Sequence, residues 1–306
     1  MSTLKPRFAI SLGDLNGVGI EIALKAHQTI SQKIDPIYCI SKTLLHDAAE
    51  RLNMVVPNNL QYHEITGSYT IEPGLISERS GHFSYHSFLN AINLAKSGAV
   101  SGVITLPIHK EAWALAGIEY KGHTDMLRDI FDQEAIMMLG CAQLYVALYT
   151  EHIPLHQVAA QIELKRLSSF LSSFYKSIGH QKVAVLGLNP HAGDNGVLGS
   201  EEQIITEAIN SVNEMIGERL FVGPVVPDIA FTPHFRSQYQ YMVAMYHDQG
   251  LAPLKALYFD ESVNISLTLP IIRTSVDHGT AFDIAYQNRA KTLSYINAVD
   301  AALEQL

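Results

Sequence analysis

The apolar run Lys182-Val183-Ala184-Val185-Leu186-Gly187-Leu188 and the turn sequence Asn189-Pro190-His191-Ala192-Gly193 that follows it decide the fold class. The first is short and rich in apolar side chains, as in a buried strand. The second carries the Asn, Pro and Gly residues of a turn. The next segment, Ser200–Met215, has the apolar spacing of a helix. A strand, a turn and a helix in this order form the repeating unit of α/β proteins.

The same alternation recurs along the chain. Further strands are predicted at Phe8–Leu12, Ile37–Ile40, Gly102–Thr105, Leu144–Tyr149, Ile229–Phe231 and Met242–Tyr246. Further helices are predicted at Ile20–Ile30, Lys42–Leu52, Tyr85–Lys96, Lys110–Leu115, Leu164–Ile178 and Ala298–Leu306. We therefore expect an α/β fold with largely parallel sheets, in which ligands bind beyond the carboxyl ends of the strands. The length of 306 residues favours one large or two medium domains.

Composition excludes several classes of protein. The net charge of −9 and the lack of a basic run argue against a nucleic-acid partner. No apolar run approaches the roughly 18 residues that cross a membrane, and the segment Met1–Arg7 does not lead into a signal-type stretch. Two cysteines, Cys39 and Cys141, are too few for a disulfide framework or a multi-cysteine zinc site. We expect a cytoplasmic protein without a membrane partner.

Common catalytic motifs are missing. The sequence has no G-x-G-x-x-G after a strand, no G-x-x-x-x-G-K-[ST], no G-x-S-x-G and no H-E-x-x-H. An enzyme of this sequence that uses a nicotinamide cofactor must therefore bind it without the usual Rossmann fingerprint.

Three histidines share one kind of position. His152, His191 and His247 each come just after a predicted strand, so a parallel sheet brings them to one edge. Neutral imidazoles are good ligands for zinc and related ions, and a catalytic site uses three protein ligands with one open position. The alternative is three unrelated loop histidines that bond to backbone. A helical pair of His152 and His156 is disfavoured by the intervening Pro154.

Two further regions are candidates for anion binding. Gly122-His123-Thr124-Asp125 precedes the helix-like Met126–Phe131, and a helix start attracts anions. The alternative there is a simple N-cap by Thr124. Lys255, Asn264 and Arg273 lie within one short stretch and suit phosphate and carboxylate groups, unless they are ordinary surface residues.

Two glycine-rich turns carry weaker signals for phosphate. Asn16–Gly19 follows the first predicted strand but lacks a complete motif. Gly193–Gly199 leads into the helix at Ser200, so its backbone N–H groups either face a diphosphate or belong to a structural loop.

Taken in order, these segments resemble the 4-hydroxythreonine-4-phosphate dehydrogenase family of pyridoxal phosphate biosynthesis. The resemblance covers nearly the whole chain. It rests on Gly13–Glu21, Thr105–Lys110, Gly122–Asp125, Gly187–Gly199, Tyr246–Lys255 and Asn264–Ala281.

A second resemblance concerns the cofactor. His278-Gly279-Thr280-Ala281-Phe282-Asp283-Ile284-Ala285 is similar to the loop with which isocitrate and isopropylmalate dehydrogenases grip the adenosine of NAD or NADP. It implies cofactor contacts from His278, Gly279, Thr280 and Asp283. We expect further cofactor contacts from Asn189, Gly193 and Gly196.

The family resemblance also implies the roles of the remaining site residues. The metal ligands are His152, His191 and His247, shared between the subunits of a homodimer. The substrate-binding residues are His123, Thr124, Lys255, Asn264 and Arg273. Three imidazoles favour Zn²⁺, with Mg²⁺ or Co²⁺ as alternatives. For the base that the reaction needs, Asp248 and Lys255 are both candidates.

The expected fold has two lobes, like that of isocitrate and isopropylmalate dehydrogenases, with a central cleft. We place the first lobe at residues 1–122 and 285–306 and the second at 123–284. The expected reaction is the NAD(P)-dependent oxidation of 4-phosphohydroxy-L-threonine at its C3 hydroxyl, followed by decarboxylation. The alternatives are a sister dehydrogenase for a phosphorylated sugar acid or a cis-dihydrodiol, a phosphate acyltransferase on a related fold, and a metal-dependent hydrolase or inactive binding protein.

Overall fold

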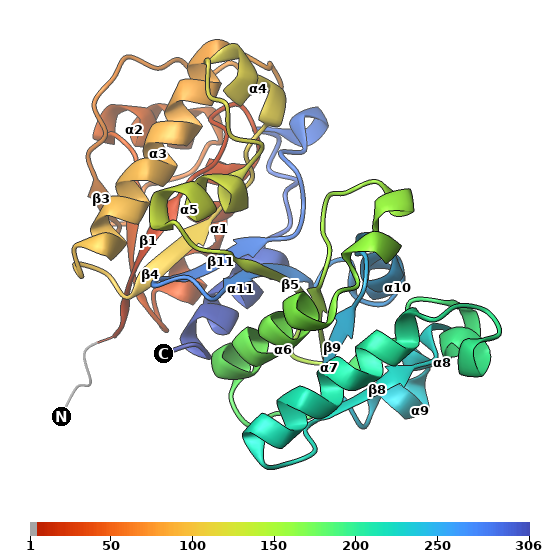
Figure 1. Cartoon of the computed structure of the whole chain (residues 1–306). Helices are drawn as coiled ribbons and strands as arrows, with labels where there is room; N and C mark the ends of the chain where they lie inside the picture. Colours follow the sequence, from red (N-terminus) through yellow and green to blue (C-terminus); the bar gives the residue numbers. More distant parts are fainter. Residues whose placement is uncertain (1–4) are drawn as a thin grey trace. The chain divides into compact units, whose positions relative to one another are not determined.

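A computed structural model describes residues 5–306 of the chain (Figure 1). The first four residues, which belong to the start where we expect no signal segment, lie outside the described part. The chain divides into two compact units. The first runs to Gln133 and also holds Val263–Ile265 and Leu269–Leu306, and the second holds Glu134–Ser262 and Ser266–Thr268. Between residues 5 and 306, every helix is too short or too polar to pass through a bilayer.

The first unit is built around parallel strands in the order β3-β2-β1-β4-β11. The strands are β1 (Arg7–Ser11), β2 (Asp35–Cys39), β3 (Gln61–His63), β4 (Gly102–Thr105) and β11 (Ile272–Val276). The helices are α1 (Gly19–Ile30), α2 (Lys42–Arg51), α3 (Glu78–Lys96), α4 (Lys110–Leu115), α5 (His123–Phe131), α11 (Leu293–Leu303) and the 3₁₀ turn η4 (Phe282–Ile284). Strand β1 is buried after its first residue because it lies between β2 and β4. This explains why it appears in the sequence as a continuous apolar run.

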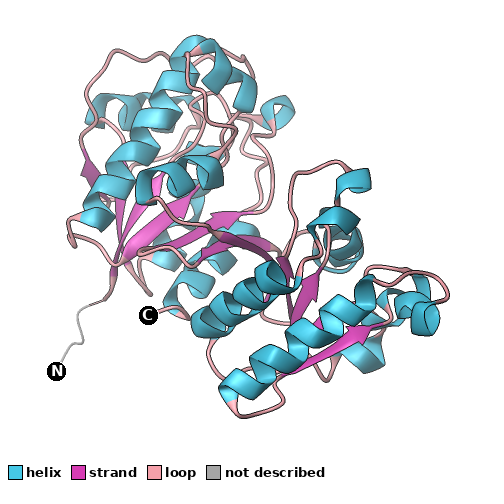
Figure 2. Cartoon of the chain, viewed as in Figure 1, coloured by secondary structure: helices cyan, strands magenta, loops and turns pink. Residues whose placement is uncertain are grey.

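The second unit has strands in the order β5-β6-β9-β7-β8, parallel except for the antiparallel pair of β5 and β6. The strands are β5 (Ile136–Cys141), β6 (Leu144–Leu148), β7 (Val183–Leu186), β8 (Phe221–Val225) and β9 (Tyr241–Ala244). The helices are α6 (Leu164–Ile178), α7 (Glu201–Ile216), α8 (Pro227–Ala230), α9 (Pro233–Arg236), α10 (His247–Tyr258) and the 3₁₀ segments η1 (Leu155–Gln157), η2 (Ala159–Gln161) and η3 (Pro190–Gly196). Strand β10 (Val263–Leu267) contributes residues to both units. Figure 2 shows the helices and strands of each unit.

The expected α/β class with largely parallel strands is confirmed. One predicted strand, Ile229–Phe231, is wrong. Its first two residues lie in the helix α8, which starts at Pro227 because proline suits the first turn of a helix. Strands β3, β5, β8, β10 and β11 and helices α8, α9 and α10 were not predicted. In α10 the internal Pro253 obscured the helical pattern.

The division between the units differs from the predicted lobe boundaries. The chain leaves the first unit after Gln133 and has returned to it by Leu269, whereas the sequence placed these crossings near residues 122 and 284. The reason is strand pairing, because β11 pairs with β4 inside the first unit. Helix α5 and the loop 278–283 therefore belong to the first unit.

Candidate functional site

The three histidines expected to bind a metal follow three adjacent parallel strands of the second unit. Strands β6, β9 and β7 are neighbours in that order and run in the same direction, so their carboxyl ends lie at one edge. His152 lies four residues beyond β6, His247 three beyond β9 and His191 five beyond β7. The strand arrangement is thus the one that the metal prediction requires.

Two of these histidines are neighbours. The ring centroids of His152 and His247 lie 5.4 Å apart. Nδ1 of His247 lies 2.7 Å from Oδ1 of Asp248. Because a carboxylate only accepts, Nδ1 carries the proton and the lone pair is on Nε2. A carboxylate behind a histidine is the usual arrangement that presents the other ring nitrogen to a metal.

The third histidine lies on a loop of unusual backbone. His191 has φ 53°, and the left-handed conformation continues through Ala192, Gly193, Asp194 and Asn195. Left-handed backbone costs L-residues roughly 1–2 kcal/mol each, so other contacts must hold this loop. Among residues 5–306, no group of three or more His, Cys, Asp or Glu side chains is assembled to hold a metal. The single chain therefore brings two of the three predicted ligands together and leaves the set incomplete.

A buried carboxylate organises the loop that carries His191. Oε1 of Glu202 accepts hydrogen bonds from the backbone N–H groups of Leu188 and Asn189, at 2.9 and 2.7 Å. The side-chain amide of Asn189 donates to Glu201 at 2.8 Å and to Glu202 at 2.9 Å. A Cβ on Gly193 would lie 2.6 Å from Glu202, so only glycine fits there. Asn189 and Gly193, both predicted to contact the cofactor, have these structural contacts in the described chain.

The first unit contains a buried cation. The guanidinium of Arg273, on β11, donates to Oγ1 of Thr105, at the end of β4, at 2.9 Å. The same nitrogen lies 3.1 Å from Nδ1 of His123, at the start of α5. Arg273 is 2% exposed, and burial lowers its pKa to about 9, so it remains a cation at neutral pH. The structure thus joins two of the predicted substrate-binding residues, His123 and Arg273, from distant parts of the sequence.

The environment of His123 defines its protonation. Burial, assisted by the Arg273 charge, lowers its pKa well below the ordinary value, so the imidazole is neutral. Because Arg273 only donates, Nδ1 of His123 accepts and the proton is on Nε2. Within residues 5–306, this buried N–H has no hydrogen-bond partner. Phe88 and Trp113 contact the ring edge-on, with centroids 4.4 and 5.8 Å away.

The other residues predicted to bind the substrate are Asn264, Thr124 and Lys255. Oδ1 of Asn264, on β10, is buried and has no hydrogen-bond partner in the described part of the chain. Thr124 is half-buried on α5, which begins at His123 with Gly122 as its N-cap. The alternative that Thr124 caps the helix is therefore wrong. Nζ of Lys255, near the end of α10, lies 5.9 Å from the ring centroid of Phe259.

The turn Asn16–Gly19 is not a phosphate cradle. Its backbone N–H groups donate to acceptors of the protein: Asn16 to Oδ1 of Asp14, Gly17 to the carbonyl of Asp14, and Val18 to the carbonyl of Thr280. Oδ2 of Asp14 accepts from Ser80 at 3.1 Å. Burial raises the pKa of Asp14 to about 6, against the opposing effect of these hydrogen bonds. A buried carboxyl group beside the turn disfavours an anion there.

The predicted cofactor loop packs on this turn. The carbonyl of Thr280 accepts from Val18 at 3.0 Å, and the ring of Phe282 stacks on His109 with centroids 5.0 Å apart. Nδ1 of His278 lies 2.9 Å from the carbonyl of Gly279, while its Nε2 is buried without a hydrogen-bond partner among residues 5–306. Gly279 is exposed and no atom lies within 4 Å of the position its Cβ would take, so a ligand can approach the backbone. Gly196 and Asp283 are also exposed.

Sequence reasoning missed two residues of these sites. Thr105 lay inside a quoted family segment, but nothing in the sequence pairs its hydroxyl with Arg273. Gln249 belongs to the segment that follows His247, but the hydrogen bonds of its side-chain amide depend on the fold. The available signal was a polar residue at or after the carboxyl end of a buried strand: Thr105 is the last residue of β4, and Gln249 lies in the first turn of α10, the helix that follows β9.

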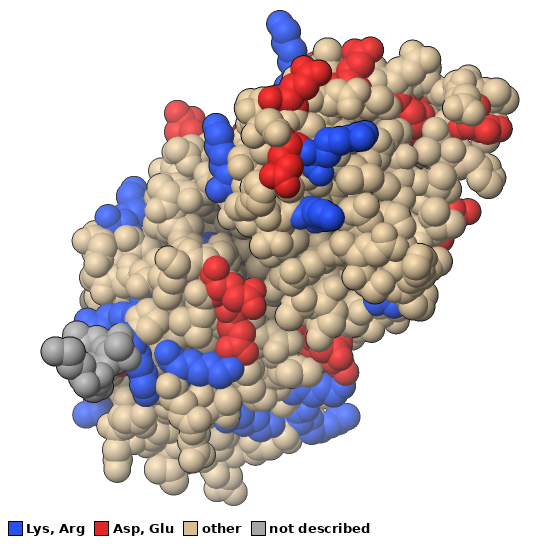
Figure 3. Space-filling model, turned by 90° about the horizontal axis from the view of Figure 1, so that it is seen from below, with Lys and Arg blue, Asp and Glu red and all other residues tan. Residues whose placement is uncertain are grey.

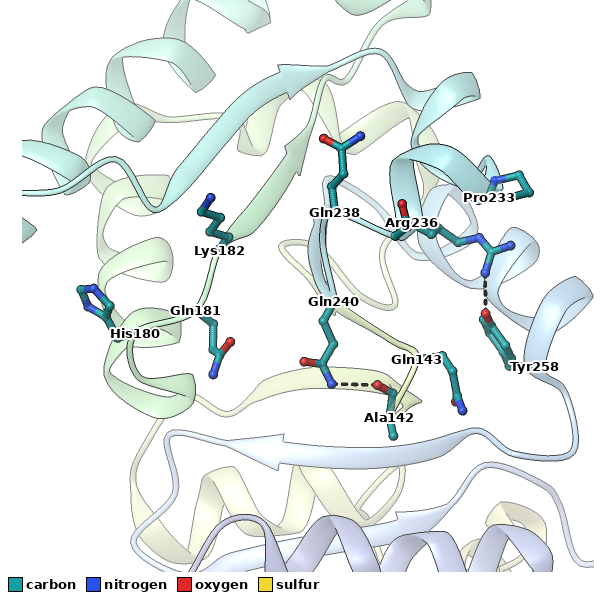
Figure 4. Close-up of a pocket in the computed structure, with 11 residues that line it drawn as sticks. Ala142, Gln143, His180, Gln181, Lys182, Pro233, Arg236, Gln238, Gln240 and Tyr258 are labelled. Carbon is teal, nitrogen blue, oxygen red and sulfur yellow. Dashed lines mark hydrogen bonds between the residues drawn. The ribbon is translucent and has the colours of Figure 1, made fainter.

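A pocket of about 770 Å³ lies at the opposite edge of the second unit's strands (Figure 4). It is lined by residues that precede β6, β9 and β7, including Gln143, Gln240 and Lys182. Arg236 also lines it, but its guanidinium already bonds to the carbonyl of Phe231 and to the hydroxyl of Tyr258. None of the predicted site residues lines this pocket.

One face of the molecular surface carries charges of both signs. On the face drawn in Figure 3, Lys and Arg side chains alternate with Asp and Glu, and no continuous basic patch forms there. A duplex-binding surface requires clustered cations.

The chain is similar to known proteins over nearly its whole length. A family model described as "Pyridoxal phosphate biosynthetic protein PdxA" matches residues 29–302. Curated proteins named 4-hydroxythreonine-4-phosphate dehydrogenase are 59% identical in Sulfurimonas denitrificans, over 98% of this chain and 97% of the relative, and 52% identical in Campylobacter fetus, over 98% of each. A crystal structure of 4-hydroxythreonine-4-phosphate dehydrogenase from Klebsiella pneumoniae superposes with a TM-score of 0.84 at 30% identity, over 100% of both chains.

Proposed function

Because the chain belongs to the pyridoxal phosphate biosynthetic protein PdxA family, we propose that it oxidises 4-phosphohydroxy-L-threonine at the C3 hydroxyl, with NAD or NADP as hydride acceptor. The product, 2-amino-3-oxo-4-phosphooxybutanoate, then decarboxylates to 3-amino-2-oxopropyl phosphate. As a β-keto acid it loses CO₂ readily, since the ketone accepts the electrons of the breaking bond. The protein acts as a cytoplasmic homodimer.

The buried guanidinium of Arg273 is the observation that carries this proposal. A buried cation is expensive unless charged or polar partners compensate it, and an anionic substrate group is a strong partner. Thr105 and His123 hold it in one orientation. The Nε2–H of His123 adds a neutral donor, and we assign both residues to one anionic end of the substrate. Lys255, Asn264 and Thr124 bind the rest of it.

The donor chemistry of His152, His191 and His247 fits a divalent cation, because imidazoles suit zinc and related metals. Two of the three rings already lie together, and Asp248 orients one of them. We propose that the set is completed between the subunits of the homodimer. A cation there supplies a Lewis acid that lowers the pKa of a bound hydroxyl.

Two further roles belong to residues of the chain: contact with the nicotinamide cofactor and acceptance of the C3 hydroxyl proton. The nicotinamide cofactor, when bound, accepts the hydride, and the exposed backbone at Gly279 with the buried Nε2 of His278 provides its contacts. The C3 proton acceptor comes from α10. Asp248 is engaged with His247, which leaves Lys255 for this role.

The test combines an assay of dehydrogenase activity with a measurement of bound metal. Purified protein should reduce NAD or NADP, followed at 340 nm, with 4-phosphohydroxy-L-threonine and should contain a stoichiometric divalent metal by elemental analysis. His247→Ala should lose the metal and at least about a thousandfold in turnover, because a catalytic cation site rarely survives loss of one of three ligands.

His156→Ala is the matched control for that experiment. His156 is an exposed histidine four residues beyond His152 and is assigned no role, so the variant should keep its metal and its rate. Full turnover after chelator treatment would refute the metal-dependent reaction. Turnover of a cis-dihydrodiol or a phosphorylated sugar acid in place of the amino acid substrate would identify a sister enzyme.

A further inference from the structure

A chain of polar contacts connects the three strand ends that precede the histidines. The hydroxyl of Thr150, beyond β6, donates to the carbonyl of Met245, beyond β9, at 2.6 Å. The backbone N–H of Met245 donates to Oε1 of Gln249 at 2.7 Å. The amide nitrogen of Gln249 then donates to the carbonyl of Gly187, beyond β7, at 2.7 Å. One side chain, Gln249, thus bridges the β9 and β7 loops.

Each contact lies close to a histidine. Thr150 is two residues before His152, Met245 is two before His247, and Gly187 is four before His191. Gln249 therefore links the β9 and β7 loops just beyond the last paired residues of the two strands, Val243 and Val185. Since both loops begin at this edge, a shift of either loop moves the imidazole that it carries.

The chemistry of the bridge requires an amide. Oε1 must accept from a backbone N–H while the nitrogen donates to a backbone carbonyl. Glutamate can accept but cannot donate, and methionine of similar length does neither well. Glutamine alone of these three satisfies both buried backbone groups.

We propose that Gln249 is a positioning residue of the cation site: within each subunit it anchors the loop of His247 and the loop of His191 to one another, which holds both imidazoles in place for the site that the homodimer completes, and so it sets the affinity for the divalent cation. This inference rests on the proposed function, because it assumes that the histidines bind a cation. Gln249 itself does not ligate it. Residues that orient metal ligands typically contribute 10- to 100-fold to metal affinity.

A matched control lies at the other end of the same strand. Gln240 immediately precedes β9, and its amide nitrogen donates to the carbonyl of Ala142 at 2.8 Å (Figure 4). It forms the same kind of bond, from a glutamine amide to a backbone carbonyl, but at the edge far along the strand from the histidines. Gln240→Met therefore measures what loss of such a bond does to folding alone.

The experiment measures Zn²⁺ binding by the metal-free, full-length protein in competition with a chromophoric chelator, together with thermal unfolding of the metal-free protein. Gln249→Met and Gln249→Glu should each bind Zn²⁺ roughly 10- to 100-fold more weakly than the wild type. Gln240→Met should bind Zn²⁺ as the wild type does. The Glu variant tests the bridge itself, because it keeps the acceptor for Met245 but replaces the hydrogen bond to Gly187 with repulsion between two oxygens.

The outcomes separate the two proposals. A wild-type protein that binds no Zn²⁺ overturns the metal part of the proposed function. If the wild type binds but Gln249→Met, or Gln249→Glu, has equal affinity, the positioning role is wrong while the proposed function stands. The role is also wrong if Gln240→Met weakens binding as much as Gln249→Met, since lost stability then explains both.

Discussion

The anion site of the first unit and the histidine edge of the second differ in where their functional atoms lie. Arg273 is buried on a strand, and Thr105 and His123 contact it from the end of β4 and the start of α5. His152 and His191 are exposed and lie on loops several residues beyond the strands. In the first unit a single chain brings Arg273, Thr105 and His123 into contact, and in the second unit it brings two of the three imidazoles together.

This difference fits the ligand that we propose for each site. A buried guanidinium needs fixed partners before the ligand arrives, because an uncompensated cation in the core is costly. Imidazoles tolerate exposure, and in the proposed function a cation and a second subunit complete their arrangement. The contacts of Arg273 are formed within one chain, whereas the proposed metal site needs residues beyond the pair His152 and His247.

The largest expected effect comes from removing the buried cation. Arg273→Ala should lower kcat/KM for 4-phosphohydroxy-L-threonine by about a thousandfold, since charge-assisted hydrogen bonds contribute roughly 1.5–3 kcal/mol each and Arg forms two. Arg273→Lys should recover only part of this loss, because lysine lacks the planar fork. Steady-state kinetics at 340 nm measure both.

A control in the same unit shows whether the effect is specific. Arg289 is exposed, and its contact to Gln287 is long at 3.4 Å, so Arg289→Ala should change kcat/KM by less than about twofold. Equal decreases of kcat/KM in the two variants, or a decrease below tenfold in Arg273→Ala, would show that Arg273 does not form an anion site in the first unit.

The second prediction concerns the buried carboxyl group of Asp14, which also lies in the first unit. Burial raises the pKa of Asp14 from 3.8 to about 6, so between these values the folded protein holds a proton that the unfolded chain has released. The contribution of Asp14 to the free energy of unfolding of the wild type therefore falls as pH rises through that window, by about 3 kcal/mol in total. Asp14→Asn removes the penalty, so it should gain stability relative to wild type between pH 4 and pH 7.

Denaturant unfolding at several pH values measures this difference. Asp300→Asn serves as the exposed counterpart, because the Asp300 side chain is 43% exposed on α11 and pairs only with Lys33 in the contacts described. Its stability difference from wild type should vary far less across the same range. A flat difference for Asp14→Asn would mean that the carboxyl group is not desolvated in the folded protein.

Much of the fold was predictable because strand–turn–helix units are local in sequence. The strand Gly102–Thr105 and the helices Lys110–Leu115 and Leu164–Ile178 were predicted with the observed boundaries. The lobe boundaries were not, because whether β11 pairs with β4 depends on contacts between residues about 170 apart. The helix α10 was hidden by Pro253, which the helix accommodates.

The sites divide in the same way. The positions of His152, His191 and His247 beyond neighbouring parallel strands followed from local patterns together with the rule on strand ends. Which side chains contact each other did not. Neither the contact of Thr105 with Arg273 nor the bridge formed by Gln249 leaves a periodic trace, since each joins residues from separate strands.

The smallest expected effect concerns the second partner of Arg273. His123 is neutral because burial, with the nearby Arg273 charge, lowers its pKa well below the ordinary value, so it donates from Nε2 without carrying charge. Glutamine also offers an acceptor to Arg273 and an N–H to the substrate. His123→Gln should therefore lower kcat/KM only about tenfold, equivalent to about 1.4 kcal/mol, whereas His123→Ala should lose more.

The pH profile decides between a neutral and a cationic His123. A neutral histidine adds no titration to substrate binding, so the ratio of kcat/KM between wild type and His123→Gln should stay constant from pH 5.5 to 8.5. A cationic histidine would make kcat/KM of the wild type higher only at low pH, and the ratio would fall as pH rises.

The pH dependence of the free energy of unfolding tests the protonation state of His123 independently. Because the folded pKa of His123 is depressed, the wild type should lose stability relative to His123→Gln as pH falls below about 6.5, where the unfolded chain gains the proton.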